Sequence, residues 1–184
     1  THAIMRYGIR QALAPQVELS SGPGCPVCVT ADRDIDYAIA LAHLPGVMVA
    51  TFGDMVRVPG MRSSLQEARA QGADVRIVYS ALDALDLARR NPQQGVVMLG
   101  VGFETTAPTV AASVAQAQRE GLCNYYVYSM HKLTPPAMRS ILDAGEVRID
   151  GIIGPGHVTT IIGSQAWAFL PGEYHVPCAV SGFE

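Results

Sequence analysis

Short runs of β-branched and aromatic residues alternate with helix-length segments along most of this 184-residue chain. Strands that alternate with helices predict a mostly parallel sheet with helices on both faces. We therefore expect an α/β fold of three layers (αβα). The runs that predict strands are Val47–Thr51, Val75–Tyr79, Gly95–Val101, Tyr125–Tyr128 and Gly151–Ile153, with weaker candidates at Gln16–Ser20 and Val176–Val180.

Capping residues mark the ends of the helical segments. Ser64 stands three residues before Glu67, which is the spacing of a capping box, and Ser80 precedes a second helical segment. Thr134 is followed by proline, which suits the first turn of a helix, and Gly145 is placed to end that helix. These signals support the alternating pattern.

Two short sequences occur twice. Gly-Pro-Gly begins at Gly22 and at Gly154, and Gly-Phe-Glu begins at Gly102 and at Gly182. The spacings differ, so the chain is not a regular repeat protein. The echoes instead predict two similar, small, Rossmann-like domains, residues 1–122 and residues 123–184.

Polar and glycine-rich clusters follow the predicted strands. In open parallel sheets the functional crevice lies beyond the carboxyl ends of the strands. We therefore expect these clusters to converge on one site. They are Gly22–Cys28, Thr51–Asp54, Gly102–Thr106, Met130–Lys132, Gly154–His157 and Ser181–Glu184.

Cys25 and Cys28 lie two residues apart in a glycine- and proline-rich turn. This spacing suits a redox-active dithiol or a pair of ligands to a soft metal. A helix that starts near Asp32 would point its free N–H groups toward Cys28 and favour the thiolate there. The alternative is a tight turn that holds two small buried residues.

Three other residues are candidates for chemistry. His157 is a proton carrier or metal ligand, or else a turn residue bonded to the backbone. Glu104 is a buried acid or part of a helix N-cap. Asp54 forms an ion pair with Arg57 or takes part in a reaction. We interpret His43, Cys123 and His175 as structural.

Composition excludes several function classes. Hydrophobic residues make up 49% and charged residues 16% of the chain, which is typical of a packed globular protein. The net charge of −3 gives no basic surface for nucleic acid, and no apolar run is long enough to span a membrane. Four cysteines without a disulfide-scaffold pattern predict a protein of the reducing cytoplasm. No nucleotide-binding G-x-G-x-x-G or Walker sequence is present.

Five sequence motifs together closely resemble the HypD family of hydrogenase maturation factors. They occur in the order of the family and cover essentially the whole chain. They are Thr1–Ile4, Gly22–Thr30, Thr51–Gly60, Gly102–Pro108 and Gly154–Val158.

The resemblance implies a scaffold, rather than a conventional enzyme, for assembling the Fe(CN)2CO centre of NiFe hydrogenases. It implies a small chaperone, HypC, as a partner, and HypE and HypF as the source of cyanide. Members of the family resemble two α/β domains followed by a region with a 4Fe–4S cluster. The resemblance implies a redox-active pair at Cys25 and Cys28, which could also bind iron. It also implies functional roles for His2, Glu104 and His157 and binding roles for Asp54, Thr105 and Thr106.

The chain also departs from the family pattern. The family's iron-anchoring cysteine would lie just before Thr1, and Cys123 and Cys178 do not supply the pattern of its cluster cysteines. We therefore expect a HypD-like core, cut at both ends, that cannot complete the work of the family alone. Two alternatives stay open: a free-standing thiol–disulfide oxidoreductase at Cys25 and Cys28, and a small-molecule binding module that uses the Gly-Pro-Gly turns.

Overall fold

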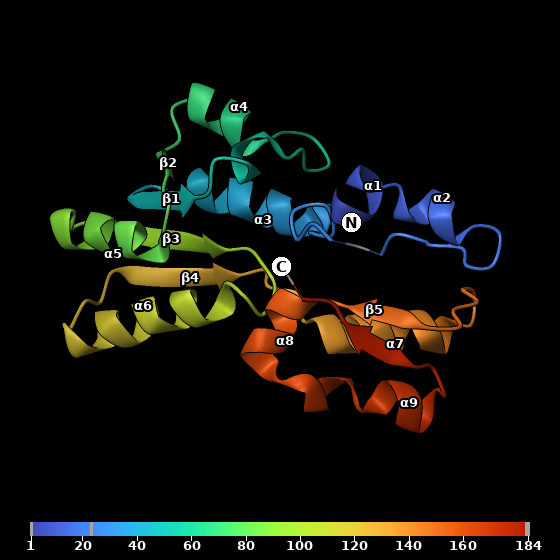
Figure 1. Cartoon of the computed structure of the whole chain (residues 1–184). Coiled ribbons are helices and arrows are strands. Elements are labelled where there is room, and N and C mark those ends of the chain that lie inside the picture. Colours follow the sequence, from blue (N-terminus) through green and yellow to red (C-terminus); the bar gives the residue numbers. More distant parts are fainter. Residues whose placement is uncertain (1, 23, 183–184) are drawn as a thin grey trace.

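The computed structural model describes residues 2–22 and 24–182 and contains a four-stranded parallel sheet (Figure 1). The strand order is β2-β1-β3-β4, and every neighbouring pair is parallel. Helices connect the strands, so the predicted α/β fold is confirmed. The strands are β1 (Val47–Thr51), β2 (Val75–Ile77), β3 (Gly95–Gly100) and β4 (Tyr125–Ser129).

Alternate residues of the central strands enter two different cores. Val49 and Leu99 pack beneath helices α3 (Asp32–Ala42) and α4 (Leu65–Ala70). Their neighbours Met48 and Met98 pack beneath α5 (Ala81–Arg90) and α6 (Ala107–Arg119) on the opposite face. Each fully buried side chain of this size contributes about 1.5–3 kcal/mol to stability. The period of two in the sequence thus produces the three layers.

A second, smaller sheet pairs β5 (Ile152–Gly154) with β6 (Cys178–Val180), again in parallel. Trp167, Phe169 and Leu170 form its core together with Val158. Phe103, from the loop after β3, also packs against this cluster and so joins the two sheets. The surrounding helices are α7 (Thr134–Ala144), α8 (Gly156–Ile162), the 3-10 helix η2 (Ser164–Trp167) and α9 (Phe169–Glu173).

The segment before α3 differs from the sequence-based prediction. It forms two short helices, α1 (His2–Arg6) and α2 (Ile9–Leu13). The weak candidate Gln16–Ser20 is not a strand, and its side chains are almost all exposed. An isolated extended segment has no neighbour to complete its hydrogen bonds or cover its face, which is why its β-like composition does not produce a strand.

The caps form largely as the sequence predicts. The Ser80 hydroxyl accepts a hydrogen bond from the N–H of Asp83, and the Asp83 carboxylate accepts one from the Ser80 N–H, which completes a capping box. Ser64 accepts from the N–H of Glu67, but the Glu67 carboxylate accepts from the Ser63 hydroxyl instead of completing a box. Gly145 ends α7 with a φ of 66°, a left-handed conformation that glycine adopts without strain.

Strand β4 lies beyond the predicted boundary at residue 122 but belongs to the four-stranded sheet, where it pairs with β3. Asn124 fixes its start, since its side-chain amide donates to the carbonyls of Ala88, Asn91 and Gln94 at 3.0 Å each. The division into two domains stays a prediction. Within the described residues, no helix has both the length and the apolar character that crossing a membrane requires.

Candidate functional site

Most of the polar clusters lie at the carboxyl ends of strands, as predicted, but the Cys25–Cys28 segment follows no strand, because Gln16–Ser20 does not form one. Phe52–Asp54 follows β1, Val101–Glu104 follows β3, and Met130–Lys132 follows β4. Pro155–His157 follows β5 in the smaller sheet. The strands of the large sheet point toward the smaller one, and β6 points back toward the middle of the molecule (Figure 1). Both sheets therefore contribute loops to the central region.

The Cys25–Cys28 segment forms a turn directly before α3. The backbone N–H of Cys28 donates to the Sγ of Cys25 at 3.3 Å. Thr30 stabilises the turn, because its hydroxyl donates to the Pro26 carbonyl at 2.9 Å and its N–H donates to the Val27 carbonyl at 3.2 Å. Both thiols are free, with Cys25 half-buried and Cys28 exposed. The alternative of two buried residues is therefore wrong, and it is Val27 that packs against the core.

The pKa values of the two thiols are shifted in opposite directions. Hydrogen bonds from the Cys28 side chain and then from its backbone N–H lower the pKa of Cys25 below its ordinary value. The same interaction raises the pKa of Cys28, because Cys28 acts as the donor. The expectation that the helix beginning at Asp32 would favour a Cys28 thiolate is thus wrong. Cys25 is therefore the more acidic thiol of the pair and loses its proton more readily than Cys28.

Asp54 lies close enough to influence this pair. Its negative charge raises the pKa of Cys25, opposing the hydrogen bonds from Cys28. The Asp54 carboxylate also accepts from the N–H of Met55 at 3.0 Å and so caps the 3-10 helix η1 (Met55–Arg57). The predicted ion pair with Arg57 does not form, since the adjacent backbone N–H takes the carboxylate instead.

Glu104 is 5% exposed and connects the two sheets. Its Oε1 accepts from the backbone N–H of Thr134 at 2.6 Å, and its Oε2 accepts from the Thr134 hydroxyl at 2.8 Å. Glu104 therefore caps α7, 30 residues further along the chain. It does not cap α6, whose N-cap is Thr106.

Thr105 and Thr106 are exposed at the start of α6. The Thr106 hydroxyl donates to the carbonyl of Phe103 at 3.2 Å. Gly102 has a φ of 154°, and a Cβ there would lie 1.7 Å from the Thr106 Oγ1. Only glycine permits this tight loop, which places Glu104 inward and the two threonines outward.

The cluster after β4 contains residues that sequence reasoning did not single out individually. The His131 ring lies against Gly100, where a Cβ would be 2.8 Å from its Cε1. Its Nδ1 is 3.0 Å from the Ser129 hydroxyl, while its buried Nε2 has no hydrogen-bond partner in the described structure. Lys132 reaches Asp34 at 3.5 Å, in the first turn of α3. Gly100, the last residue of β3, leaves room for the His131 ring, and this glycine is the sequence signal that could have indicated a close neighbour there.

The two remaining histidine candidates each lie in the first turn of a helix. His157 is exposed in the first turn of α8, at the carboxyl end of β5. His2 begins α1, and its side chain lies outside the described part of the chain.

The described residues contain no group of three or more His, Cys, Asp or Glu side chains placed to hold a metal. Cys25 and Cys28 offer at most two soft thiolate ligands, so iron bound there would need ligands from elsewhere. Cys123 is exposed before β4, while Cys178 starts β6 with its pKa raised by burial. These two cysteines do not form a cluster site with the others.

The chain is similar to hydrogenase maturation factors over its full length. The family model HypD, described as "Hydrogenase formation hypA family", matches residues 1–184. Hydrogenase maturation factor HypD is 50% identical over 184 residues in Rhodobacter capsulatus, 52% over 190 in Azotobacter vinelandii and 47% over 184 in Escherichia coli K12. Each alignment covers 100% of this chain and 49%, 50% and 49% of the respective relative. The chain thus spans about half the length of these relatives.

Proposed function

The chain belongs to the HypD family of hydrogenase maturation factors, and on this premise we propose that it forms part of a scaffold for assembling the Fe(CN)2CO centre of NiFe hydrogenases. The observation that carries the proposal is the Cys25–Cys28 pair. The pKa of Cys25 is lowered and that of Cys28, its hydrogen-bond donor, is raised. Neither thiol is fully buried.

Iron with cyanide and carbonyl ligands is the cargo of this scaffold. Thiolate sulfur is a soft ligand and suits such low-spin ferrous iron. Cys25 supplies the thiolate, and Cys28 supplies a second sulfur when it loses its proton. The other ligands come from cyanide, carbon monoxide and a protein segment outside the described residues.

The same pair can deliver two electrons. The Cys25 thiolate and the Cys28 thiol form a disulfide and release two electrons and one proton. A thiocyanate adduct on a carrier protein, accepting those electrons, would separate into a carrier thiolate and a cyanide ion. The dithiol must then be reduced again, for which we propose a 4Fe–4S cluster held by a part of the full-length protein outside this chain.

Three further expectations follow from family membership. We propose a HypC-type chaperone and HypE as partners, because assembly needs both a carrier for the iron and a cyanide donor. We place this work in the cytoplasm, where thiols are kept reduced. We propose that five further residues shape the loops between the two sheets of the scaffold: Asp54, Glu104, Thr105, Thr106 and His157.

An infrared spectrum tests this function. The full-length protein that contains this chain would be purified without oxygen together with its HypC-type chaperone. We expect cyanide and carbonyl stretching bands, their loss in Cys25→Ser and Cys28→Ser, and their retention in Cys123→Ser, which removes an exposed cysteine before β4. Circular dichroism would confirm that each variant folds.

The alternative of a free-standing thiol–disulfide oxidoreductase gains no support from the relatives, which are maturation factors. The same preparation distinguishes the two functions. Infrared bands that persist without Cys25 and Cys28 would contradict the proposal. Absent bands combined with efficient insulin reduction would favour the oxidoreductase.

A further inference from the structure

Among the described residues, strand β2 pairs only with β1 and so forms an open edge of the four-stranded sheet. On its inner side, the Asp74 carbonyl accepts from the N–H of Val49, and the Val78 N–H donates to the Thr51 carbonyl, both at 2.9 Å. The N–H and C=O groups of one strand residue point to one edge, and those of the next residue point to the other edge. The N–H and C=O of Ile77 therefore face outward, where another strand could bond to them.

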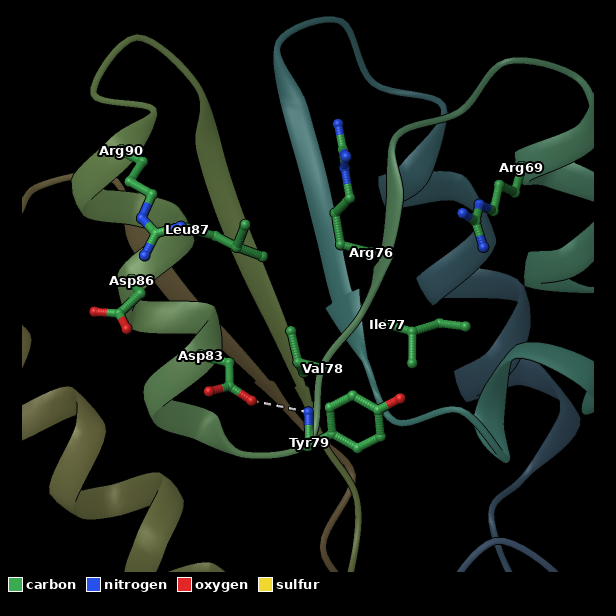
Figure 2. A pocket seen from close by; sticks show the side chains of 9 residues that line it. All are labelled: Arg69, Arg76, Ile77, Val78, Tyr79, Asp83, Asp86, Leu87 and Arg90. Atoms are coloured by element: carbon green, nitrogen blue, oxygen red, sulfur yellow. Dashed lines mark hydrogen bonds between the residues drawn. The ribbon is translucent and has the colours of Figure 1, made fainter.

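A groove of about 460 Å³ follows this edge between helices α4 and α5. Figure 2 shows that its side chains approach the edge from both faces of β2. Leu87 and Val78 lie on the α5 side, while Ile77 lies on the side of α4 and Arg69. A strand added here would thus meet an apolar surface on each of its faces.

The lining of the groove has one more positive than negative charge, although the whole chain has a net charge of −3. Arg69, Arg76 and Arg90 line it together with Asp83 and Asp86. Both carboxylates already have interaction partners within the chain. Asp83 accepts from the N–H groups of Tyr79 and Ser80 at 3.0 Å each, and Asp86 pairs with Arg89.

Two of the three arginines have no carboxylate partner. Arg76 pairs with Asp74 at 2.5 Å, but Arg69 and Arg90 form no ion pair with any part of the chain that the structure describes. They stand at opposite sides of the groove (Figure 2). Their charge favours an anionic occupant on both faces of an added strand.

From this edge and its charges we infer that β2 docks an extended acidic segment of a partner protein, which adds a fifth strand to the sheet. Its backbone bonds to Ile77, and its side chains alternate between the two faces. Acidic residues contact Arg69 and Arg90, and apolar residues contact Ile77 and Leu87. Cys25 is not among the residues that line the groove, and the inference does not depend on the function proposed above.

Protection of an edge strand is a simpler explanation for part of this surface. Natural proteins place charged residues on short edge strands to prevent uncontrolled pairing, and Arg76 fits that role. Protection does not explain an edge at which Ile77 is 43% and Tyr79 92% exposed. Exposed apolar and aromatic groups beside unpaired cations are typical of a surface that binds.

Fluorescence anisotropy tests the proposal with a labelled ten-residue peptide that repeats two glutamates and two valines, so that each face of the extended strand carries both residue types. We expect binding that weakens with salt and falls about tenfold or more in Arg69→Glu/Arg90→Glu, because attraction at both sides becomes repulsion. Arg10→Glu, which makes the same charge change on the exposed helix α2, should bind normally. A lysine–valine peptide should not bind.

A second measurement separates strand addition from simple charge attraction. The acidic peptide should slow hydrogen exchange at the Ile77 amide, and a version with two central prolines should neither bind nor protect. Equal binding of the proline peptide, equal binding to Arg69→Glu/Arg90→Glu, or no binding would each overturn the proposal. Protection of Ile77 that rises with protein concentration alone would assign the edge to a second copy of this chain instead.

Discussion

Both oxygens of the buried Glu104 carboxylate accept hydrogen bonds from one residue, Thr134, at 2.6 Å from its backbone N–H and 2.8 Å from its hydroxyl. Glu104 lies in the loop between β3 and α6. Thr134 begins α7, which packs against the smaller sheet. A negative charge at a helix N-terminus is favourable in itself. The pair therefore both starts α7 and links the two sheets.

We expect Glu104→Ala to lower the free energy of unfolding by about 1–3 kcal/mol, because it leaves the Thr134 N–H without its acceptor. Thr134→Val removes only the hydroxyl and should cost less. In the double variant the two losses should not add, since both remove the same interaction. Chemical denaturation of the four proteins measures this coupling.

Glu18→Gln is the matched control, because Glu18 is an exposed glutamate in the segment before α3. It should leave stability unchanged. Strictly additive losses in Glu104→Ala and Thr134→Val would contradict a direct link between the two residues.

The Cys25 thiol should react with iodoacetamide faster than the Cys28 thiol at neutral pH. Its pKa is lowered first by the Cys28 side chain, so Cys28→Ala should raise that pKa and slow alkylation of Cys25 several-fold. Cys28→Ser keeps a hydroxyl donor and should preserve most of the reactivity. Alkylation against pH, with Cys123 and Cys178 replaced by serine, gives each profile.

Identical pH profiles for Cys28→Ala and the parent protein would show that Cys25 does not depend on its partner. Faster alkylation of Cys28 than of Cys25 would reverse the assignment of the nucleophile. Either result would also weaken the proposed redox step.

Asp54→Asn should have the opposite effect on Cys25. The Asp54 charge raises the pKa of this thiol, so its removal should lower the pKa and modestly speed alkylation at neutral pH. Asparagine keeps an oxygen that can accept from the Met55 N–H, so η1 should stay intact. The gain should shrink in high salt, which screens the original charge.

Asp150→Asn removes an equal charge from an exposed position and should not change the Cys25 profile. An unchanged profile in Asp54→Asn at low salt would exclude an electrostatic role for Asp54.

Local patterns predicted the sheets but not the contacts that complete the site. β-branched runs and caps such as Ser80 depend on neighbouring residues, so they are visible in the sequence. The link from Glu104 to Thr134 spans 30 residues and needs the fold to bring the two together. The sequence favours a Cys28 thiolate because the helix at Asp32 is the only local signal, while the geometry of the turn makes Cys28 the hydrogen-bond donor.

Competition from the backbone explains the failed prediction for Asp54 and Arg57. The Met55 N–H is adjacent in the chain and costs little entropy to reach, whereas an exposed ion pair must order two flexible side chains. The Gln16–Ser20 prediction failed for a tertiary reason, since a strand needs a neighbour that no local pattern can supply.

Acid should destabilise the fold through His131. Burial lowers the pKa of this histidine, so the unfolded chain binds its proton more tightly than the folded one does. Its contribution to stability is fully present above the unfolded pKa of about 6.5 and is lost as the pH falls from there toward the lower folded value. We expect His131→Gln to have a flatter dependence of unfolding free energy on pH between about 7.5 and 5.5 than the parent protein.

His43→Gln separates this effect from the loss of any histidine, because His43 is exposed at the end of α3. It should keep the parent's pH dependence. The ring of His131 lies against Gly100, where a Cβ would come within 2.8 Å of it. Equal slopes for His131→Gln and the parent protein in urea denaturation would show that another group controls the acid sensitivity.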